Sequence, residues 1–391
     1  MNEPKLRFKA DDGSQFPEWE EKKLNEIAVR VTRKNKDNVT DIPLTISSAD
    51  GLIDQRNFFN KVVASKDMSG YYLLKNGEFA YNKSYSKGYD FGSIKRLDLY
   101  DEGALSTLYI CFALNKNENS DFYQKYFDSL SWYPELQKIC AEGARNHGLL
   151  NVPTNDFFQL KLCVPSSDKE QQKIAEFLST IDTVIEKQKE TVSSWEERKK
   201  GVMQKLFNQE VRFKADDGSE FPEWEEKHFS EMYKSIPNKQ YQISTKEYKK
   251  CGKYKVIDQG KDFIAGYYDD KSKVYGSVPI IVYGDHTTVV KYLDEPFVIG
   301  ADGTKLLDKI SNNFDIKFLY FALNFNNVKQ MGYKRHFSAL KEISFTIPFS
   351  LAEQQKIADC LSTLDEVIEK QKATLAAWEK LKKGLLQQMF V

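Results

Sequence analysis

Apolar residues recur at alternating steps of four and three along two stretches of the chain, 170–207 and 353–390. This spacing is the seam of a heptad repeat, and since no proline interrupts it, each stretch is predicted to form one helix about 57 Å long. The first seam contains Ile174, Leu178, Ile181, Ile185, Val192 and Trp195. The second seam contains Ile357, Leu361, Leu364, Ile368, Leu375 and Trp378. Such helices need partners to cover their apolar seams.

The two stretches are copies of each other, identical at 24 of 38 aligned positions. Further apolar residues stand one position before the seam and widen its stripe, namely Phe177, Val184, Cys360, Val367 and Leu381. A wide stripe is typical of a bundle that includes further helices. The alternative is that the stripe packs against other parts of this chain.

A second motif also occurs twice. Residues 7–22 return as residues 212–227 and are identical at 15 of 16 positions. The shared Asp-Asp-Gly-Ser predicts a turn, and Pro17 and Pro222 stand where a first helical turn could begin. Each half of the chain is therefore expected to open with the same docking turn.

Between each opening and the following long helix lies a segment of about 140 residues, and the two segments differ from each other. Runs of aromatic and β-branched residues broken by turn signals predict strands in both. They lie at 41–47, 70–74 and 105–114 in the first segment and at 253–257, 278–283 and 289–293 in the second. Residues 316–323 favour a buried helix. Each segment closes on a short strand that ends in proline, 158–165 and 343–348.

The chain thus reads opening, lobe, helix, and then the same order again. Because the second lobe connects the end of the first helix to the start of the second, the helices are expected to run antiparallel. A parallel pair would need a return of about 57 Å across a lobe about 38 Å wide. The predicted fold is α+β: two globular domains joined by two long antiparallel coiled-coil helices, with a pseudo-twofold internal repeat. The expected boundaries are 1–165, 166–208, 209–348 and 349–391.

Composition adds limits to this reading. The formal net charge is zero, with 57 basic and 57 acidic side chains, so bulk charge gives no argument for nucleic acid. The five cysteines are scattered without C-x-x-C spacing, which favours buried thiols over disulfides or a zinc site. No apolar stretch is long enough to span a membrane, and the N-terminus lacks a signal peptide's apolar core. A cytoplasmic protein is expected.

Motifs of catalysis are missing from the sequence. It contains no adjacent prolines, and therefore no [ND]-P-P-[YFW] motif of adenine methyltransferases, no G-x-x-x-x-G-K-[ST] and no H-E-x-x-H. The four histidines show no metal-ligand spacing. We therefore expect a protein that binds no metal and no cofactor of its own, whereas a divergent nuclease site of a few carboxylates and a lysine would give too weak a signal to be found in this way.

Two unlike lobes on a repeated framework indicate bipartite recognition, in which the framework presents the same surface twice to two copies of one partner. The order P-x-W, lobe, strand ending in proline, then E-Q-x-x-I-A-x-x-L-x-x-x-D-x-x-I, resembles the specificity subunit of type I restriction-modification systems. The last motif runs from Glu170 through Asp182 to Ile185, and again from Glu353 through Asp365 to Ile368. The resemblance covers essentially the whole chain.

The resemblance implies that each lobe is a target recognition domain that reads one half of a split, asymmetric site in double-stranded DNA. It implies that the paired helices set the spacer and bind two DNA adenine methyltransferase subunits, which carry S-adenosylmethionine. Restriction subunits with translocase activity would join the complex. The subunit itself would be a non-catalytic part of this methyltransferase and endonuclease.

Candidate DNA-binding residues in the first lobe form two clusters. Amides, hydroxyls and lysines can contact base edges and phosphates, and arginine can bridge two acceptors of guanine. The first cluster is Asn82, Lys83, Ser84, Tyr85, Ser86, Lys87 and Tyr89. The second cluster is Arg145, Asn146 and His147.

The second lobe carries two clusters at corresponding points of the chain. One is Tyr283, Asp285, His286, Thr287 and Thr288, and the other is Tyr333, Lys334, Arg335 and His336. The alternative for any single residue is a solvated loop with no ligand. For each cluster as a group, its position in the chain favours DNA.

Two other classes of protein remain open from the sequence. A coiled-coil scaffold with two protein-binding lobes fits the zero net charge, but not the basic loops rich in amides. An enzyme with two active sites would need matching carboxylates or nucleophiles in both lobes, and none are found. DNA binding through phosphates weakens as salt rises, so a salt titration separates the DNA-binding hypothesis from the protein scaffold.

Overall fold

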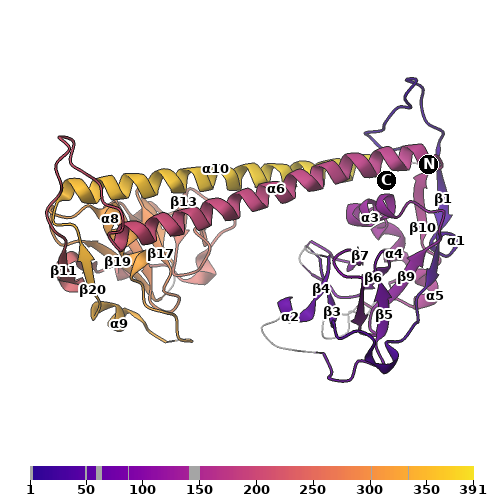
Figure 1. Ribbon diagram of the computed structural model, residues 1–391, viewed down its shortest axis with the longest axis horizontal. Helices are drawn as coiled ribbons and strands as arrows, with labels where there is room; N and C mark the ends of the chain where they lie inside the picture. Colours follow the sequence, from indigo (N-terminus) through magenta and orange to yellow (C-terminus); the bar gives the residue numbers. More distant parts are fainter. Residues whose placement is uncertain are drawn as a thin grey trace. The chain divides into compact units, whose positions relative to one another are not determined.

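The computed structural model describes residues 3–48, 51–58, 64–86, 88–140, 150–300, 302–332 and 334–391. The chain divides into two compact units. Unit 1 consists of Met1–Gln188 with Thr374–Val391, and unit 2 consists of Lys189–Ala373. Each unit holds one lobe and a part of each long helix, as the colours in Figure 1 show.

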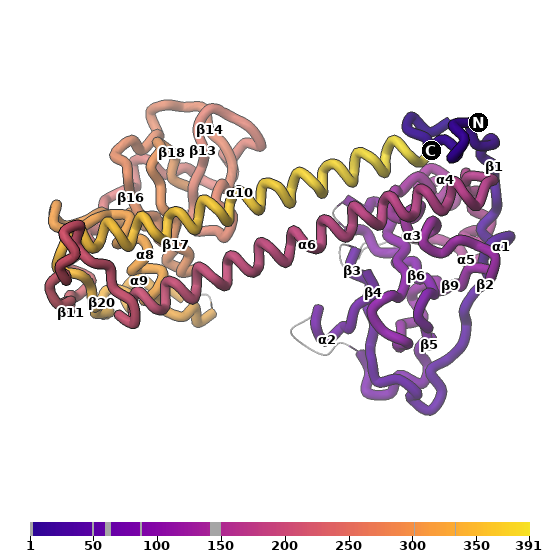
Figure 2. Tube along the Cα trace, turned by 45° about the horizontal axis from the view of Figure 1, so that its top comes forward, coloured from indigo at the N-terminus to yellow at the C-terminus, as the bar shows by residue number. Residues whose placement is uncertain are grey.

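The two predicted helices are α6 (Asp168–Phe207) and α10 (Leu351–Met389). In unit 1, Ile174 near the start of α6 shares a hydrophobic core with Met389 at the end of α10. In unit 2, Leu206 near the end of α6 shares a core with Ile357 near the start of α10. Each helix start therefore packs with the end of the other helix, so the pair is antiparallel, as predicted (Figure 2).

The predicted seam is confirmed, because none of its residues is exposed. Those that are buried are Ile174, Leu178, Ile181, Ile185, Val192, Ile357, Leu361 and Ile368. The half-buried ones are Trp195, Leu364, Leu375 and Trp378. In the wider stripe, Phe177 is 37% exposed and Leu381 is 47% exposed, so the described part of the chain leaves this face partly open.

Lobe 1 precedes α6. Its elements are β1 (Trp19–Lys23), α1 (Leu24–Ile27), β2 (Ala28–Arg30), η1 (Lys36–Asn38), β3 (Leu44–Ser47), β4 (Gly51–Asp54), α2 (Gln55–Phe58), β5 (Tyr72–Lys75), β6 (Phe79–Asn82), β7 (Ser93–Arg96), β8 (Glu102–Leu105), β9 (Ile110–Leu114), α3 (Ser120–Ser129), α4 (Tyr133–Ile139), α5 (Thr154–Phe157) and β10 (Lys161–Pro165). Its main sheet has the strand order β2-β9-β6-β7, with antiparallel neighbours. Phe127 of α3 packs on Phe79 and Phe112 of this sheet.

Lobe 2 lies between the long helices. Its elements are β11 (Glu225–His228), α7 (Phe229–Met232), β12 (Tyr233–Ile236), η2 (Lys239–Tyr241), η3 (Thr245–Glu247), β13 (Tyr254–Ile257), β14 (Gly266–Tyr268), η4 (Lys271–Lys273), β15 (Val274–Tyr275), β16 (Ile280–Gly284), β17 (Val290–Leu293), β18 (Phe297–Ile299), β19 (Thr304–Lys309), α8 (Ile316–Phe325), α9 (Phe337–Lys341) and β20 (Ser344–Ile347). Its main sheet has the order β12-β19-β16-β17, again antiparallel. The two lobes therefore share a sheet topology despite their unlike sequences, and the predicted α+β class is confirmed.

The expected helical turn at Pro17 and Pro222 is wrong. The residues after these prolines form strands instead, since β1 pairs antiparallel with the closing strand β10, and β11 pairs in the same way with β20. Helical residues begin only at Leu24 and Phe229. Pairing with the closing strand satisfies the backbone and buries Trp19, which outweighs the local preference of proline for a helix start.

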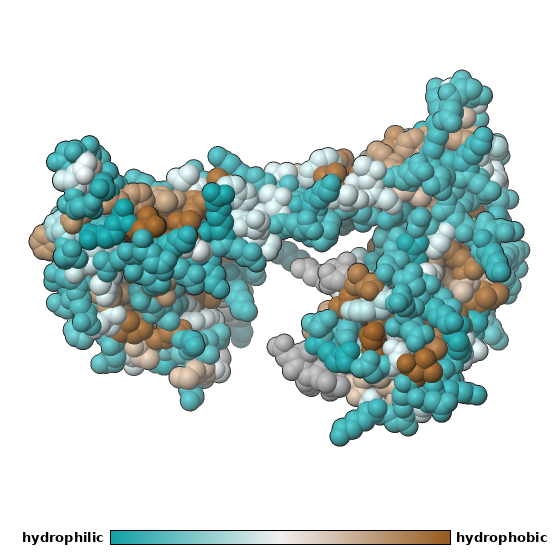
Figure 3. Space-filling view, in the orientation of Figure 1, coloured by the Kyte–Doolittle hydropathy of each residue, from teal (hydrophilic) through white to brown (hydrophobic). Residues whose placement is uncertain are grey.

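Figure 3 shows mostly hydrophilic atoms on the visible surface of each unit, with apolar atoms in separate small patches. All five cysteines are free thiols, as expected. Cys111 is buried, but Cys251 is exposed, so the prediction of buried thiols is wrong for that residue. Among the helices in the described part of the chain, none has the length and apolar content to cross a bilayer.

Candidate nucleic-acid interface

The repeated Glu-Gln motif at the start of each long helix fixes the lobe to the helix. Glu170 is fully buried and accepts hydrogen bonds from Nε and Nη2 of Arg7 at 2.8 and 2.9 Å, and from Nε1 of Trp19 at 3.3 Å. In unit 2, Glu353 accepts the same bonds from Arg212 and Trp224. The carboxylate of Glu170 raises the pKa of the Arg7 guanidinium. Each opening is thus tied to a helix by a charged, two-pronged contact.

The next residue of the motif holds the closing strand. Nε2 of Gln171 donates to the carbonyl oxygen of Pro165 at 2.9 Å, and Nε2 of Gln354 donates to that of Pro348 at 3.0 Å. The opening, the closing strand and the helix start therefore meet at one point in each unit. The contacts of this junction are the same in both halves of the chain. The rest of each lobe lies outside the junction and differs in sequence between the two halves.

The loop after β6 contains the first predicted cluster of lobe 1, and much of its polar chemistry is used within the lobe. Oδ1 of Asn82 accepts from the backbone N–H of Ser84 at 2.9 Å, and Ser86 and Tyr89 pair through their backbones. Tyr85 is the most open of these residues, with 61% of its surface exposed. Lys87 lies outside the described residues.

Lys83, predicted to contact phosphates, is partly buried and makes a contact within the lobe. Its Nζ donates to the carbonyl oxygen of Val152 at 3.1 Å, and burial lowers the pKa of its ammonium group, with a smaller effect from Arg30. The carbonyl oxygen of Lys83 also accepts from the backbone N–H of Leu150. The second cluster, Arg145, Asn146 and His147, lies outside the described residues, although the chain that follows it is anchored here.

The loop between β16 and β17 contains the first predicted cluster of lobe 2. The structure brings Asp285 of this loop together with His336 of the second cluster. The carbonyl oxygen of Asp285 accepts from the backbone N–H of His336 at 2.8 Å and lies 3.1 Å from Nδ1 of its ring. Oδ1 of Asp285 accepts from the backbone N–H of Phe337 at 2.9 Å. The two clusters form one loop assembly.

Asp285 and His336 are buried, at 3% and 4% exposure, and their polar groups bind other parts of the protein. Nε2 of His336 accepts from the backbone N–H of Met331, so Nδ1 carries the ring proton. Direct contact of these two side chains with bases, as predicted from the sequence, does not fit this burial. They are placed to hold the loops instead.

The exposed members of the lobe 2 clusters are Lys334 and Arg335, whereas His286, Thr287 and Thr288 are partly exposed. Tyr283 is fully buried and its hydroxyl has no hydrogen-bond partner in the described part of the chain. Tyr333 lies outside the described residues. The cationic side chains of the lobe 2 clusters are therefore exposed to solvent, whereas Asp285 and His336, which hold the loops, are buried.

Sequence reasoning missed the residues that tie these loops to the sheet below. Directly after β13, Oε1 of Gln259 accepts from the backbone N–H of His286 at 3.1 Å. At the corresponding place after β3, the hydroxyl of Ser48 lies 2.9 Å from the hydroxyl of Ser86. Single polar residues at strand ends carry no periodic signal, so only the fold reveals them.

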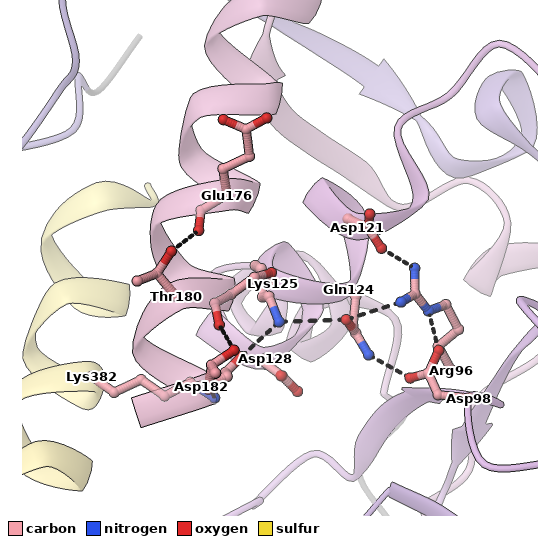
Figure 4. A network of polar contacts seen from close by, with 12 residues as sticks. Arg96, Asp98, Asp121, Gln124, Lys125, Asp128, Glu176, Thr180, Asp182 and Lys382 are labelled. Atoms are coloured by element: carbon pink, nitrogen blue, oxygen red, sulfur yellow. Dashed lines mark hydrogen bonds and ion pairs between the residues drawn. The ribbon is translucent and has the colours of Figure 1, made fainter. Parts of the chain in front are cut away.

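A charged network crosses unit 1 from the lobe to both long helices (Figure 4). Nζ of Lys125 on α3 lies 2.6 Å from Oδ2 of Asp182 on α6, and Nζ of Lys382 on α10 lies 2.5 Å from Oδ1 of the same carboxylate. Burial opposes ionisation of Asp182, but the two ammonium groups outweigh it and lower its pKa. Oε1 of Gln124 lies near both Lys125 and Arg96, which extends the network to β7.

The described residues contain no group of three or more His, Cys, Asp or Glu side chains that could hold a metal ion. In lobe 2 the arrangement offers loops of mixed polar and cationic character at one end of the main sheet. Such loops are suited to contacts with phosphates and base edges.

The family signature of the type I restriction modification DNA specificity domain matches residues 222–377. The chain is 24% identical over 418 residues to a specificity subunit, MjaX, provisionally assigned to a type I restriction enzyme of Methanocaldococcus jannaschii. This alignment covers 97% of the chain and 94% of that protein. The specificity subunit of the type I restriction enzyme MjaVIII from the same organism is 24% identical over 330 residues, covering 76% of each chain.

Solved structures share the fold. The crystal structure of the type I restriction-modification S subunit from M. genitalium matches with a TM-score of 0.56 and 14% identity, over 100% of this chain and 99% of that one. A structure from work on complex assembly and conformational transition of the type I system matches with a TM-score of 0.50 and 16% identity, over 96% and 98%.

In each unit the same motif fixes a lobe to the pair of antiparallel helices, and the two lobes share one sheet topology. With the matches above, residues 222–377 carry the type I restriction modification DNA specificity domain, and the chain as a whole is similar to specificity subunits of type I restriction-modification systems.

Proposed function

We propose that this chain is the DNA sequence-specificity subunit of a type I restriction-modification complex. Each lobe reads one half of a bipartite, asymmetric site in duplex DNA. The paired helices set the spacer between the halves and dock two DNA adenine methyltransferase subunits. Restriction subunits with translocase activity complete the complex.

The observation that carries this proposal is the contrast between framework and loops. The two lobes have the same strand order, and the loops after β6 and β16 occupy corresponding places. Their residues differ, and so do the residues that hold them. Two lobes with the same fold but different loop residues suit a DNA target with two unlike halves.

Local charge supports DNA in lobe 2 although the chain as a whole is neutral. Residues 327–341 contain three lysines and one arginine and no carboxylate. Lys334 and Arg335 of this segment are exposed. Cations placed beside polar loop residues can bind phosphates while the loop meets base edges.

The helices support the partner assignment. The framework sequence occurs twice, and its widened apolar stripe stays partly exposed at Phe177 in the first copy and at Leu381 in the second. An equivalent surface present twice suits two copies of one partner. Modification would then be performed by the methyltransferase subunits, which bind S-adenosylmethionine, while this chain has no catalytic role and no cofactor. The complex would act in the cytoplasm, where its DNA lies.

The decisive experiment combines the chain with the methyltransferase subunit encoded beside it and maps methylated adenines in DNA of random sequence. The expected result is one split motif with unlike halves. Exchange of lobe 2 should change one half only. Absence of both a complex and methylation would refute the proposal.

A salt titration separates DNA binding from a protein scaffold. If phosphates are bound, the logarithm of affinity should fall linearly with the logarithm of salt concentration. An affinity that does not depend on salt would contradict binding through the cationic loops.

A further inference from the structure

We propose that Gln259 is a positioning residue for sequence recognition, one that fixes the loop between β16 and β17 in the shape that reads DNA. This inference rests on the proposed function of lobe 2. It concerns a residue that has no place in the predicted clusters and acts through its neighbours.

Gln259 joins three segments of lobe 2. Its Oε1 accepts from the backbone N–H of His286 at 3.1 Å, and its Nε2 donates to the carbonyl oxygen of Asp302 at 2.8 Å. Its own carbonyl oxygen accepts from the hydroxyl of Thr287 at 2.5 Å. One side chain and its backbone thus hold two consecutive residues of the loop and the segment before β19.

Two glycines make room for Gln259. A Cβ atom on Gly303 would lie 2.6 Å from Nε2 of Gln259, and Gly303 also has a φ of +88°. A Cβ atom on Gly284 would lie 3.0 Å from the Cβ of Gln259 and 2.1 Å from Oγ1 of Thr287. Because the distances of 2.6 and 2.1 Å are too short for non-bonded atoms, the close packing around Gln259 depends on glycine at these positions.

The segment that carries Gln259 is itself fixed from below. Nζ of Lys291, which is 4% exposed, donates to the carbonyl oxygens of Asp258 at 2.8 Å and Asp262 at 2.6 Å. Gln259 therefore projects from an anchored turn. A loop held from an anchored turn is preorganised, which lowers the entropy lost on binding.

The loop that Gln259 fixes also contacts the segment that carries the exposed cations Lys334 and Arg335. Nε2 of Gln330 donates to the carbonyl oxygen of His286 at 3.2 Å, and His336 is bound to Asp285 of the same loop. The loop fixed by Gln259 is thus the piece against which the segment with Lys334 and Arg335 is placed. A shift of this loop should disturb base reading more than the attraction of phosphates.

Lobe 1 provides a matched control. Ser48 follows β3 as Gln259 follows β13, and its hydroxyl lies near the hydroxyls of Ser86 and Ser93 at 2.9 and 3.3 Å. Replacement of Ser48 should affect the half-site read by lobe 1. Replacement of Gln259 should affect the other half-site.

The test uses the full chain in complex with its methyltransferase subunits and compares wild type, Gln259→Ala, Gln259→Glu and Ser48→Ala. Methylation is measured on a library of targets that differ at one base pair. The salt dependence of DNA affinity and the melting temperature are measured in parallel. Glutamate keeps the acceptor for His286 and loses the donor for Asp302.

For Gln259→Ala we expect discrimination against single mismatches in one half-site to fall roughly tenfold, the scale of one base-pair contact. The other half-site and the salt slope should not change, since phosphate contacts remain. Gln259→Glu should fall between wild type and alanine. Ser48→Ala should act on the opposite half-site only.

A second route disturbs the same contact without changing Gln259. Gly303→Ala places a methyl group against the side chain of Gln259, so discrimination between target sequences should fall as in Gln259→Ala. The double variant should discriminate no worse than Gln259→Ala alone, because the contact is already lost. Additive losses in discrimination would argue against the inference.

Failure of this inference is distinguishable from failure of the proposed function. A wild-type complex that methylates no split site overturns the function. A wild-type complex that reads a split site, with Gln259→Ala equally selective in both halves, overturns only the role of Gln259. Equal loss in both halves, or a changed salt slope, would also overturn it, because it would indicate general damage.

Discussion

Lys199 on α6 contacts Asp365 on α10, with 2.5 Å between Nζ and Oδ1. The same pair recurs with the copies exchanged, since Lys382 on α10 contacts Asp182 on α6, also at 2.5 Å. In each pair, the lysine of one helix copy thus forms an ion pair with the aspartate of the other copy. A slip of one heptad would break both pairs, so they help to fix the antiparallel register.

The surroundings of the two pairs differ, and this difference predicts unequal responses to charge exchange. Lys199→Asp should destabilise unit 2 by about 1–2 kcal/mol, and the double variant K199D/D365K should recover about half of this loss. In unit 1 the double variant K382D/D182K should recover little, because Lys125 would face the new lysine. Chemical unfolding of each variant measures these changes.

Equal recovery in both units would show that Lys125 has no part in the network. Lys372 of α10 serves as a matched control, since it forms an ion pair with Glu196 but is 46% exposed. Its replacement by Asp should cost less than about 1 kcal/mol.

Asp182 should make unit 1 sensitive to acid. Burial raises the pKa of this carboxyl, but the combined effect of Lys382 and Lys125 in the opposite direction is larger. Its pKa in the folded chain therefore lies below the usual 3.8. Its contribution to stability is therefore present above about pH 3.8 and is lost as pH falls through the lower, folded value. Asp182→Asn should destabilise at pH 7, and its difference from wild type should shrink below pH 4, as measured by urea unfolding.

The buried carboxylate of Glu170 should be costly to remove. Glu170→Ala leaves Arg7 and the indole N–H of Trp19 without their acceptor, and we expect a loss of about 3 kcal/mol. Glu353→Ala should do the same in unit 2. Glu379→Ala, on an exposed position of α10, is the control. Differential scanning calorimetry that shows equal melting for Glu170→Ala and the control would contradict this account of the motif.

Arg335 should contribute to DNA affinity through its charge. Arg335→Ala is expected to weaken DNA binding roughly tenfold and to reduce the salt slope by about one. Lys250→Ala removes another exposed cation of lobe 2, outside the loop assembly, and should change neither quantity. Fluorescence anisotropy at several salt concentrations measures both.

The thiols should differ in reactivity. Burial raises the pKa of Cys111 to about 12, with Glu78 adding to the effect, so this thiol is protonated at pH 8 as well as inaccessible. Cys251 is exposed. Iodoacetamide at pH 8 should label Cys251 in the native chain, as followed by mass spectrometry, and label Cys111 only after unfolding.

The periodic parts of the fold could be predicted from the sequence. The heptad spacing of residues such as Leu178 and Leu361 predicted the long helices and their buried seam, because one helix face repeats the same environment many times. The closing strands at Pro165 and Pro348 were predicted as short strands that end in proline. The turn at Pro17 was misread because its partner strand lies far away in the sequence.

The site was less predictable. Loops without a period gave the right region in lobe 2, but the sequence could not tell the exposed Arg335 from the buried Asp285 and His336. Gln259 was missed, because its role depends on neighbours more than 25 positions away. Lys125 was missed for the same reason, since its partner Asp182 is 57 positions away.

The pairing of each lobe's first and last strands has a consequence for how such proteins change. Since β1 lies beside β10, and β11 beside β20, the ends of each lobe are adjacent and held by framework residues such as Glu170 and Glu353. The contacts of the junction are made by the openings, these strands and the helix starts, so the loops between the strands can change without altering them. Under the proposed function, selection would then alter one half of the preferred site while assembly and the other half are inherited unchanged.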